Sequence, residues 1–200
     1  MIESVEALRR VYNEAKGRAV QKQIDFIDAH CARFIELSPF VVVASGNVHG
    51  ALDASPRGGA PGFVRVADAH TLLIPDSPGN NRLDTLTNII ATGSVGLLFM
   101  IPGVDETLRV NGRARLNDDI SILVTFADDK RTPKLVIEIT VIDAYLHCAK
   151  AFMRSQLWSP ASVVDRAVLP TMGAMLSNQT GTPSVPETQA EMRARYTVDL

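Results

Sequence analysis

Two arginines lie in turns of the kind that bind phosphate groups. Arg57 falls within the loop sequence SPRGGAPG, and Arg82 follows Asn81 in the turn sequence PGNNRLD. A phosphate monoester needs cationic donors together with backbone N–H groups, which glycine-rich loops and helix starts supply. Both arginines could equally be solvated loop residues, because neither loop has a Walker-type pattern. The two turns therefore indicate a candidate anion site without fixing its ligand.

The turn at Arg82 leads into a predicted amphipathic helix. We expect Asn81 to cap its N-terminus, Asp84 to close an approximate capping box, and Gly93 to end it. The N-terminus of such a helix attracts anions through unpaired N–H groups and the helix dipole. Its apolar face would consist of Leu83, Leu86, Ile89 and Ile90.

A second candidate set lies near the end of the predicted core. Lys150, Arg154 and Trp158 are spaced i, i+4 and i+8, so a helix over residues 149–157 would place them on one face. They could be a solvated helix face with one capping aromatic ring. Tryptophan is nevertheless rarely left exposed without a use, so this face is also a candidate ligand contact.

Two His–Cys pairs, His30–Cys31 and His147–Cys148, are the only groups that suggest zinc. Adjacent residues diverge by about a hundred degrees on a helix and face opposite ways on a strand, so each pair fits one ion poorly. Small core thiols are the simpler interpretation. The sequence therefore predicts no metal site, and it contains no GxSxG, HExxH or CxxC motif.

Composition narrows the class of protein. A chain of 200 residues with 46% hydrophobic content predicts one domain with a real core. The net charge of −2 lacks the basic bias of nucleic-acid binders. With two cysteines, no signal-peptide pattern and no apolar run long enough to cross a bilayer, we expect a cytoplasmic protein without a membrane or nucleic-acid partner.

The first part of the chain reads as helices followed by a hairpin. Apolar residues recur at helical spacing over residues 1–16 and again over 18–37, where Ser38 and Pro39 end the pattern. Two extended stretches, residues 40–44 and 51–54, flank the turn sequence SGNVHG. They predict a β-hairpin.

The middle of the chain reads as strands around the central helix. Prolines and glycines predict irregular structure over residues 55–62, followed by short strands at 63–66 and 70–74. The nearly continuous apolar run 95–101 predicts a strand buried on both faces. In the strand after it, apolar Leu108, Val110, Ala114 and Leu116 alternate with Thr107, Arg109, Asn111, Arg113 and Arg115, so one face is core and one is basic.

A long β-rich run at residues 134–142 completes the predicted strands. Strands with helices packed outside them favour an α+β fold over a wound parallel sheet. We expect N-terminal helices over residues 1–37, a barrel over 38–158 and a C-terminal extension over 159–200, within a single structural domain.

Several motifs in the same order identify a resemblance. The segments SPRG, LLIPDSPGNNRLDTLTNI, GLLFMIPG, ETLRVNGRARL and HCAKAFMRSQLW resemble the pyridoxamine 5'-phosphate oxidase-like, FMN-binding split-barrel superfamily. Within it they are similar to a subfamily of FMN-dependent enzymes whose substrate is usually unassigned. The resemblance covers roughly residues 26–158. It implies a Greek-key, mostly antiparallel split β-barrel with flanking helices, and FMN as cofactor.

The resemblance also implies roles for individual residues. Arg82, beside Asn81, matches the basic residue that holds the FMN phosphate; Arg57 matches a second arginine less closely, and Arg65 is the alternative for that role. Leu73, Ile74 and Pro75 match the segment along the isoalloxazine edge. Thr107 stands where the oxidases commonly carry a glutamine that touches the flavin. The pattern CxKAxxRSxLW places Lys150, Arg154 and Trp158 against flavin or substrate, across a dimer.

The resemblance thus implies a homodimeric FMN-dependent oxidoreductase that acts on an unidentified small molecule, with no catalytic residue assigned. A true pyridoxamine 5'-phosphate oxidase is not expected, because the family's C-terminal Arg-Leu-His element is absent from this sequence. The alternatives are a non-catalytic flavin- or small-molecule-binding protein, or a deazaflavin- or haem-binding member of the same fold.

Overall fold

A computed structural model describes residues 1–128, 131–182 and 187–197. The chain divides into two compact units, Met1–Ser155 and Gln156–Leu200, which we describe separately. The first unit contains the whole β-sheet.

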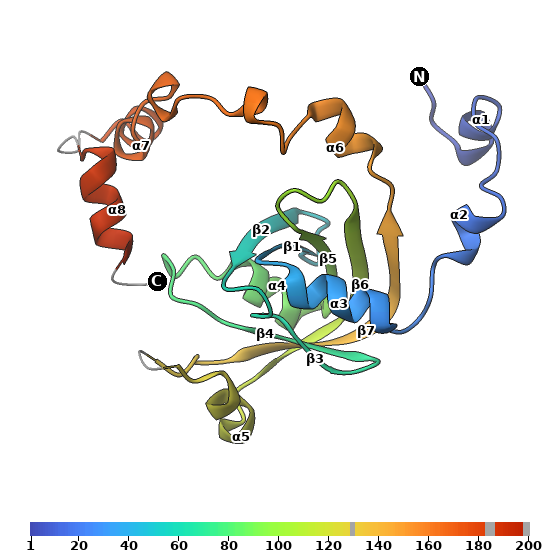
Figure 1. The fold of residues 1–200 in the computed structure, drawn as a ribbon, viewed down its shortest axis with the longest axis horizontal. Helices are drawn as coiled ribbons and strands as arrows, with labels where there is room; N and C mark the ends of the chain where they lie inside the picture. The colour runs from blue at the N-terminus through green and yellow to red at the C-terminus, as the bar shows by residue number, and fades with distance from the viewer. Residues whose placement is uncertain (129–130, 183–186, 198–200) are drawn as a thin grey trace. The chain divides into compact units, whose positions relative to one another are not determined.

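The first unit is built on a seven-stranded antiparallel sheet of order β2-β1-β5-β6-β7-β4-β3 (Figure 1). The sheet is not closed, because β2 and β3 remain edge strands. Helices flank it, so the α+β architecture predicted from the sequence is confirmed. The strands are β1 (Phe40–Gly46), β2 (Leu52–Gly58), β3 (Arg65–Asp68), β4 (Thr71–Pro75), β5 (Ser94–Met100), β6 (Thr107–Asn117) and β7 (Val136–His147).

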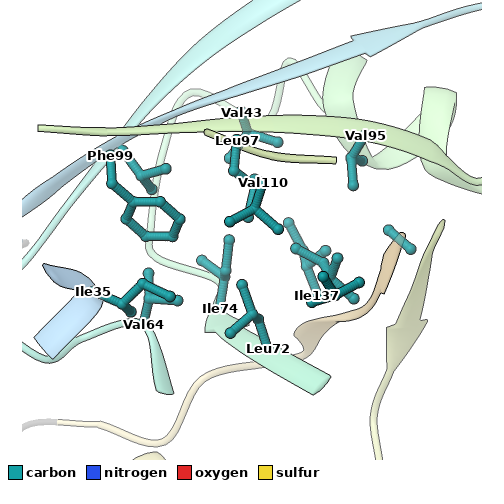
Figure 2. Packing of buried hydrophobic residues seen from close by; sticks show 14 of the residues in the cluster. Ile35, Val43, Val64, Leu72, Ile74, Val95, Leu97, Phe99, Val110 and Ile137 are labelled. Carbon is teal, nitrogen blue, oxygen red and sulfur yellow. The ribbon is translucent and has the colours of Figure 1, made fainter. Parts of the chain in front are cut away.

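One hydrophobic core lies on the inner face of this sheet. Alternate residues of β1, β5, β6 and β7 point into it, as the two-residue period of a strand requires. Figure 2 shows side chains from these strands packed in one cluster with Ile74 from β4 and Ile35 from a helix. The alternation predicted for β6 is confirmed, since Leu108 and Val110 are fully buried while Arg109 is exposed.

Two helices of equal length contribute to this core. Helix α3 (Ala29–Leu37) contacts β3, β6 and β7, and helix α4 (Asp84–Thr92) contacts β1, β2, β5 and β6. The shorter helices α1 (Val5–Arg9), α2 (Arg18–Gln21) and α6 (Lys150–Ser155) bury no residue, and α5 (Ile120–Leu123) buries Leu123. A 3₁₀ turn, η1 (Val124–Phe126), follows α5.

The predicted continuous helix over residues 18–37 is wrong. The chain leaves helical geometry after α2 because Ile24 forms an isolated β-bridge with Ala144 of β7, and both of their N–H groups bond across it. Asp28 then starts α3 by accepting a hydrogen bond from the Cys31 N–H at 2.7 Å. A long-range backbone pairing therefore outweighs the local helical pattern.

Two strand predictions also need correction. Residues 55–58 belong to β2 rather than to an irregular loop, and Pro56 is accommodated because β2 is an edge strand. Strand β5 is not buried on both faces, since its buried residues alternate with half-buried ones such as Leu98 on the outer face. The outer face of β5 is therefore apolar but partly accessible in a single chain.

The second unit consists of short helical segments. These are η2 (Pro160–Ser162), η3 (Arg166–Val168), α7 (Met172–Thr180) and α8 (Gln189–Thr197). None of these elements contains a buried residue. Gly181 ends α7 in the left-handed conformation, which glycine adopts without strain.

Candidate functional site

The start of α4 differs from the sequence prediction. The helix begins at Asp84, so Asn81 is not its N-cap and Asp84 cannot close a capping box with it. Asn81 instead adopts a left-handed conformation with φ of 59°, which asparagine tolerates better than most residues, and the Asn80 side chain accepts a 3.0 Å bond from the Arg82 N–H. Leu83 occupies the cap position, and no side chain in the described part of the chain caps the helix. The Asp84 N–H donates to the Arg82 carbonyl oxygen, which leaves the Thr85 and Leu86 N–H groups as the first-turn donors without a hydrogen-bond partner among the described residues.

Arg82 lies immediately beside this open helix start. Its side chain is 80% exposed, and its Nε donates to Asp84 Oδ2 at 2.6 Å. This hydrogen bond is the main reason that the pKa of Arg82 is raised. Among the described residues, neither terminal nitrogen of the Arg82 guanidinium donates a hydrogen bond. The guanidinium can therefore bind an anion through these nitrogens while it keeps Asp84.

A polar network below α4 holds its first turn against the sheet. Thr85 is only 2% exposed, and its hydroxyl donates to Asp53 Oδ2 at 2.5 Å and lies 2.9 Å from Ser55 Oγ. Ser55 in turn donates to the same carboxylate at 3.0 Å. Because a buried hydroxyl is costly to leave unpaired, this network fixes α4 to β2.

The network continues one turn along the helix. Asn88 is 8% exposed, and its amide donates to Ser45 Oγ of β1 at 3.0 Å. Sequence reasoning missed these residues because it sought the buried face among apolar side chains only. Thr85 and Asn88 take the places expected for Leu83 and Ile90, which are 55% and 77% exposed. Their i, i+3 spacing beside Leu86 and Ile89 was the available signal.

Arg57 is placed differently from Arg82. It lies on β2, and its guanidinium pairs with Asp76 at 3.3 Å, each side chain being 21% exposed. Asp76 follows β4 directly, so this ion pair connects an edge strand to the opposite side of the open sheet. Arg57 Nε is buried and has no hydrogen-bond partner among the described residues. The structure gives Arg57 and Arg82 separate carboxylate partners and does not bring them into contact with each other.

The other residues implied by the resemblance are distributed over both faces of the sheet. Ile74 is fully buried in the core, whereas Leu73 and Pro75 are half-buried on the opposite face of β4. Thr107 begins β6, is 5% exposed, and is paired in register with His147 of β7. A ligand on the outer face could therefore reach the Leu73 and Pro75 side chains but not that of Ile74.

The predicted helical face at Lys150 is only partly formed. Lys150 and Arg154 lie one turn apart on α6, and both are exposed. The helix ends at Ser155 and Gln156 adopts a positive φ of 51°, so the predicted series does not continue to Trp158. Trp158 belongs to the second unit and is half-buried there.

The described residues contain neither a metal-binding cluster nor a membrane-spanning helix. Within the described residues, no group of three or more His, Cys, Asp or Glu side chains is arranged to hold a metal ion. No helix in the described ranges is long and apolar enough to cross a membrane.

Solved structures with this fold come from several bacteria. HupZ from Group A Streptococcus is 18% identical with a TM-score of 0.50, over 60% of this chain and 99% of that one. A candidate pyridoxamine 5'-phosphate oxidase from Lactobacillus delbrueckii is 15% identical with a TM-score of 0.49, over 61% and 95%. An FAD-binding protein from Mesorhizobium loti is 14% identical with a TM-score of 0.41, over 62% and 97%. At these identities, the HupZ likeness supports the fold alone.

The sequence itself carries the stronger relationship. No curated protein is similar enough to match the chain. The family described as pyridoxamine 5'-phosphate oxidase, however, matches residues 27–148, a span that extends from just before α3 to the end of β7 and includes α4. The chain therefore belongs to the pyridoxamine 5'-phosphate oxidase family.

Proposed function

We propose that this protein binds FMN and is an oxidoreductase that acts on a small molecule other than pyridoxamine 5'-phosphate. The observation that carries the proposal is the family match over residues 27–148, which includes the whole sheet and the helix behind Arg82. FMN, when bound, supplies hydride or single-electron transfer. The protein residues then bind the cofactor, exclude water from it and orient the substrate.

The start of α4 fits the phosphate of such a cofactor. Among the described residues, no side chain caps the first turn of this helix, and the terminal nitrogens of Arg82 donate no hydrogen bond. Backbone donors beside an exposed guanidinium are the combination that binds a phosphate monoester. In this proposal, Thr85 and Asp53 position the helix start, Arg82 binds the phosphate, and Arg57 joins β2 to Asp76.

The remaining contacts follow from the resemblance described above. The half-buried Leu73 and Pro75 side chains would shield the flavin ring from water, Thr107 would approach its edge, and Arg57 or Arg65 would be the second cation of the family. Lys150, Arg154 and Trp158 would contact flavin or substrate. The chain lacks an Arg-Leu-His element, so it lacks the group built to pair with pyridoxamine 5'-phosphate.

We also propose that the protein is a homodimer in the cytoplasm. The outer face of β1 and β5 carries half-buried Val42, Leu98 and Met100 in a row of apolar residues, and a second copy would remove this area from water. The free thiols Cys31 and Cys148 suit a reducing compartment.

Fluorescence-quenching titration with FMN tests the cofactor proposal. Arg82→Ala should weaken FMN binding by about ten- to a hundred-fold, because a charge-assisted hydrogen bond would be lost. Arg33→Ala is the matched control, since Arg33 is also exposed and also pairs with a nearby carboxylate, that of Glu36. Wild-type protein that leaves FMN fluorescence unchanged would contradict the proposal.

Three further measurements address the cofactor, the chemistry and the assembly. The absorption spectrum of the purified protein distinguishes FMN from deazaflavin and haem by their separate bands. FMN-loaded protein given pyridoxamine 5'-phosphate and oxygen should form little pyridoxal phosphate. A turnover of ~1 per second, an ordinary enzymatic rate, would show that the missing Arg-Leu-His motif is dispensable.

Light scattering should give the mass of a dimer at micromolar concentration, and a monomer mass with FMN bound would exclude the proposed interface.

A further inference from the structure

A second group of hydrogen-bond donors, two of them cationic, lies on the outer face of β6 and β7, apart from the start of α4. It consists of Arg109 on β6, Tyr145 and His147 on β7, and Lys22, which directly follows α2. The strand register pairs Arg109 with Tyr145 and Thr107 with His147, so these side chains share one face of the sheet. They come from three segments that are far apart in the sequence. Arg109 and His147 lie in two of the motifs described above, but the motifs alone do not show that they meet Lys22 and Tyr145.

Arg109 and Tyr145 form the centre of the group. Arg109 Nη1 donates to the Tyr145 hydroxyl oxygen at 3.0 Å. Because this oxygen accepts from the guanidinium, the hydroxyl proton is directed away from Arg109 and can be donated to another group. Arg109 is exposed, and its remaining N–H groups form no ion pair within the described residues.

Lys22 and His147 complete the group around the Tyr145 ring. Lys22 Nζ lies 5.1 Å from the centre of that ring and donates to the Leu146 carbonyl oxygen at 2.6 Å. The His147 ring lies 5.0 Å from the Tyr145 ring, measured between their centroids. The Lys22 ammonium has further protons to donate, so all four side chains offer donors beside one aromatic ring.

No carboxylate neutralises this group in the described part of the chain. Neither Lys22 nor Arg109 is in an ion pair with Asp or Glu there. Asp143 lies on the same face, two positions before Tyr145; its carboxylate accepts a hydrogen bond from the Asn111 amide at 2.9 Å and forms no ion pair with Lys22 or Arg109 among the described residues. Cations held close together without an acidic partner repel one another, and a bound anion would relieve that repulsion.

We propose that Lys22, Arg109, Tyr145 and His147 form a binding site for the oxyanion group of a small molecule, a carboxylate or a phosphate. Arg109 and Lys22 supply the positive charge, and the Tyr145 hydroxyl and the His147 ring supply directed donors. The site shares no residue with the proposed cofactor-phosphate site at α4. It can therefore be tested on the protein whether or not a flavin is bound.

The state of His147 provides a direct measure of occupancy. Burial, and then the charges of Lys22 and Arg109, lower the pKa of His147. An anion bound among these groups would offset the two charges and stabilise the imidazolium, so it should raise the pKa of His147. By linkage, the affinity for an anion that does not itself titrate in this range should rise as pH falls through that pKa.

The experiment is an NMR titration of the histidine ring signals with sodium sulfate, at constant ionic strength maintained with sodium chloride. The chain has four histidines, so His147 can be assigned by the signal lost in His147→Gln. We expect a saturable shift of the His147 signals and a raised pKa. Parallel titrations with inorganic phosphate and with acetate then show which oxyanion class binds more tightly.

Three variants locate the effect. Arg109→Met should weaken sulfate binding by about ten- to a hundred-fold, and Tyr145→Phe, which keeps the ring, should weaken it by a smaller factor. Arg113→Met is the matched control, because Arg113 lies on the outer face of the same strand but bonds Ser94 instead. The absence of a saturable His147 shift, or equal sulfate affinity in the Arg109, Tyr145 and Arg113 variants, would overturn the proposal. If Arg109→Met fails to fold, the sulfate affinities of Tyr145→Phe and Arg113→Met are compared instead, and equal values would overturn the proposal.

Discussion

Helices α3 and α4 are each nine residues long and both contribute to the one core, yet they are built in opposite ways. Helix α3 is capped by Asp28 and buries the apolar residues Cys31 and Ile35. Helix α4 has no side-chain cap and buries Thr85 and Asn88 together with Leu86 and Ile89. Among the described residues, two helices of the same length thus differ in whether a side chain caps the first turn.

The two helices therefore differ in role: α3 supports the core, whereas α4 presents the candidate binding site. In α3, burial and the neighbouring Asp28 raise the pKa of the Cys31 thiol to about 12, so this group stays protonated and unreactive at neutral pH. In α4, the buried polar side chains fix the position of the helix, while the Thr85 and Leu86 N–H groups of its first turn have no hydrogen-bond partner among the described residues. An open helix start can serve as a binding site only if something else holds the helix, and the Thr85 network does so.

The largest expected effect concerns the core side of α3. Ile35→Ala removes a fully buried side chain and should lower the free energy of unfolding by about 2–5 kcal/mol. Urea denaturation followed by circular dichroism measures it. The FMN affinity of the folded variant should stay unchanged if α3 is purely structural. A loss of FMN affinity in the folded Ile35→Ala variant, measured at low urea concentration, would contradict the purely structural role of α3.

The next effect concerns the polar side of α4. Thr85→Val keeps the shape of the side chain but removes the hydroxyl that bonds Asp53, so unfolding should become easier by about 1–3 kcal/mol. Unlike Ile35→Ala, this variant should also weaken FMN, because the helix start would no longer be held in place. Urea denaturation and FMN titration of the same sample measure both effects. Thr85→Ser should restore most of each, and a Ser variant no better than Val would show that the hydroxyl is not responsible.

A smaller effect is expected at the cap of α3. Asp28→Ala removes the acceptor for the Cys31 N–H and should cost about 1 kcal/mol of stability. The comparison predicts no corresponding loss for Leu83→Ala in α4, because Leu83 occupies the cap position without a side-chain hydrogen bond. Urea midpoints of the two variants, measured side by side, test this. Equal losses at both positions would mean that the cap at α3 contributes nothing specific.

The smallest expected effect is the pH dependence of that cap. The Cys31 N–H hydrogen bond lowers the pKa of Asp28 in the folded protein, so its contribution is fully present above the unfolded pKa, about 3.9 for aspartate. The contribution is lost as pH falls through the lower folded pKa. The stability difference between wild type and Asp28→Ala should therefore shrink on acidification below that range. A difference that stays constant down to pH ~2 would contradict this linkage.

The sequence by itself determined the parts of the molecule that depend on local pattern. The hairpin of β1 and β2, the alternation of β6 around Leu108 and Val110, and the end of α4 at Gly93 were all predicted, because each follows from neighbouring residues on one strand or one helical turn. The resemblance of ordered motifs added the family, which the match over residues 27–148 confirms.

Only the tertiary structure decided which side chains meet. Ile24 breaks a helix by pairing with Ala144, Thr85 reaches back to Asp53, and Arg57 is held by Asp76. Lys22 reaches the Leu146 carbonyl across 124 positions of sequence, which places it beside Tyr145. No local period encodes such contacts, because they depend on strand order and on the way the open sheet brings distant segments together. The sequence therefore located the binding helix, whereas the fold decided what holds that helix and which cations gather on the opposite face of the sheet.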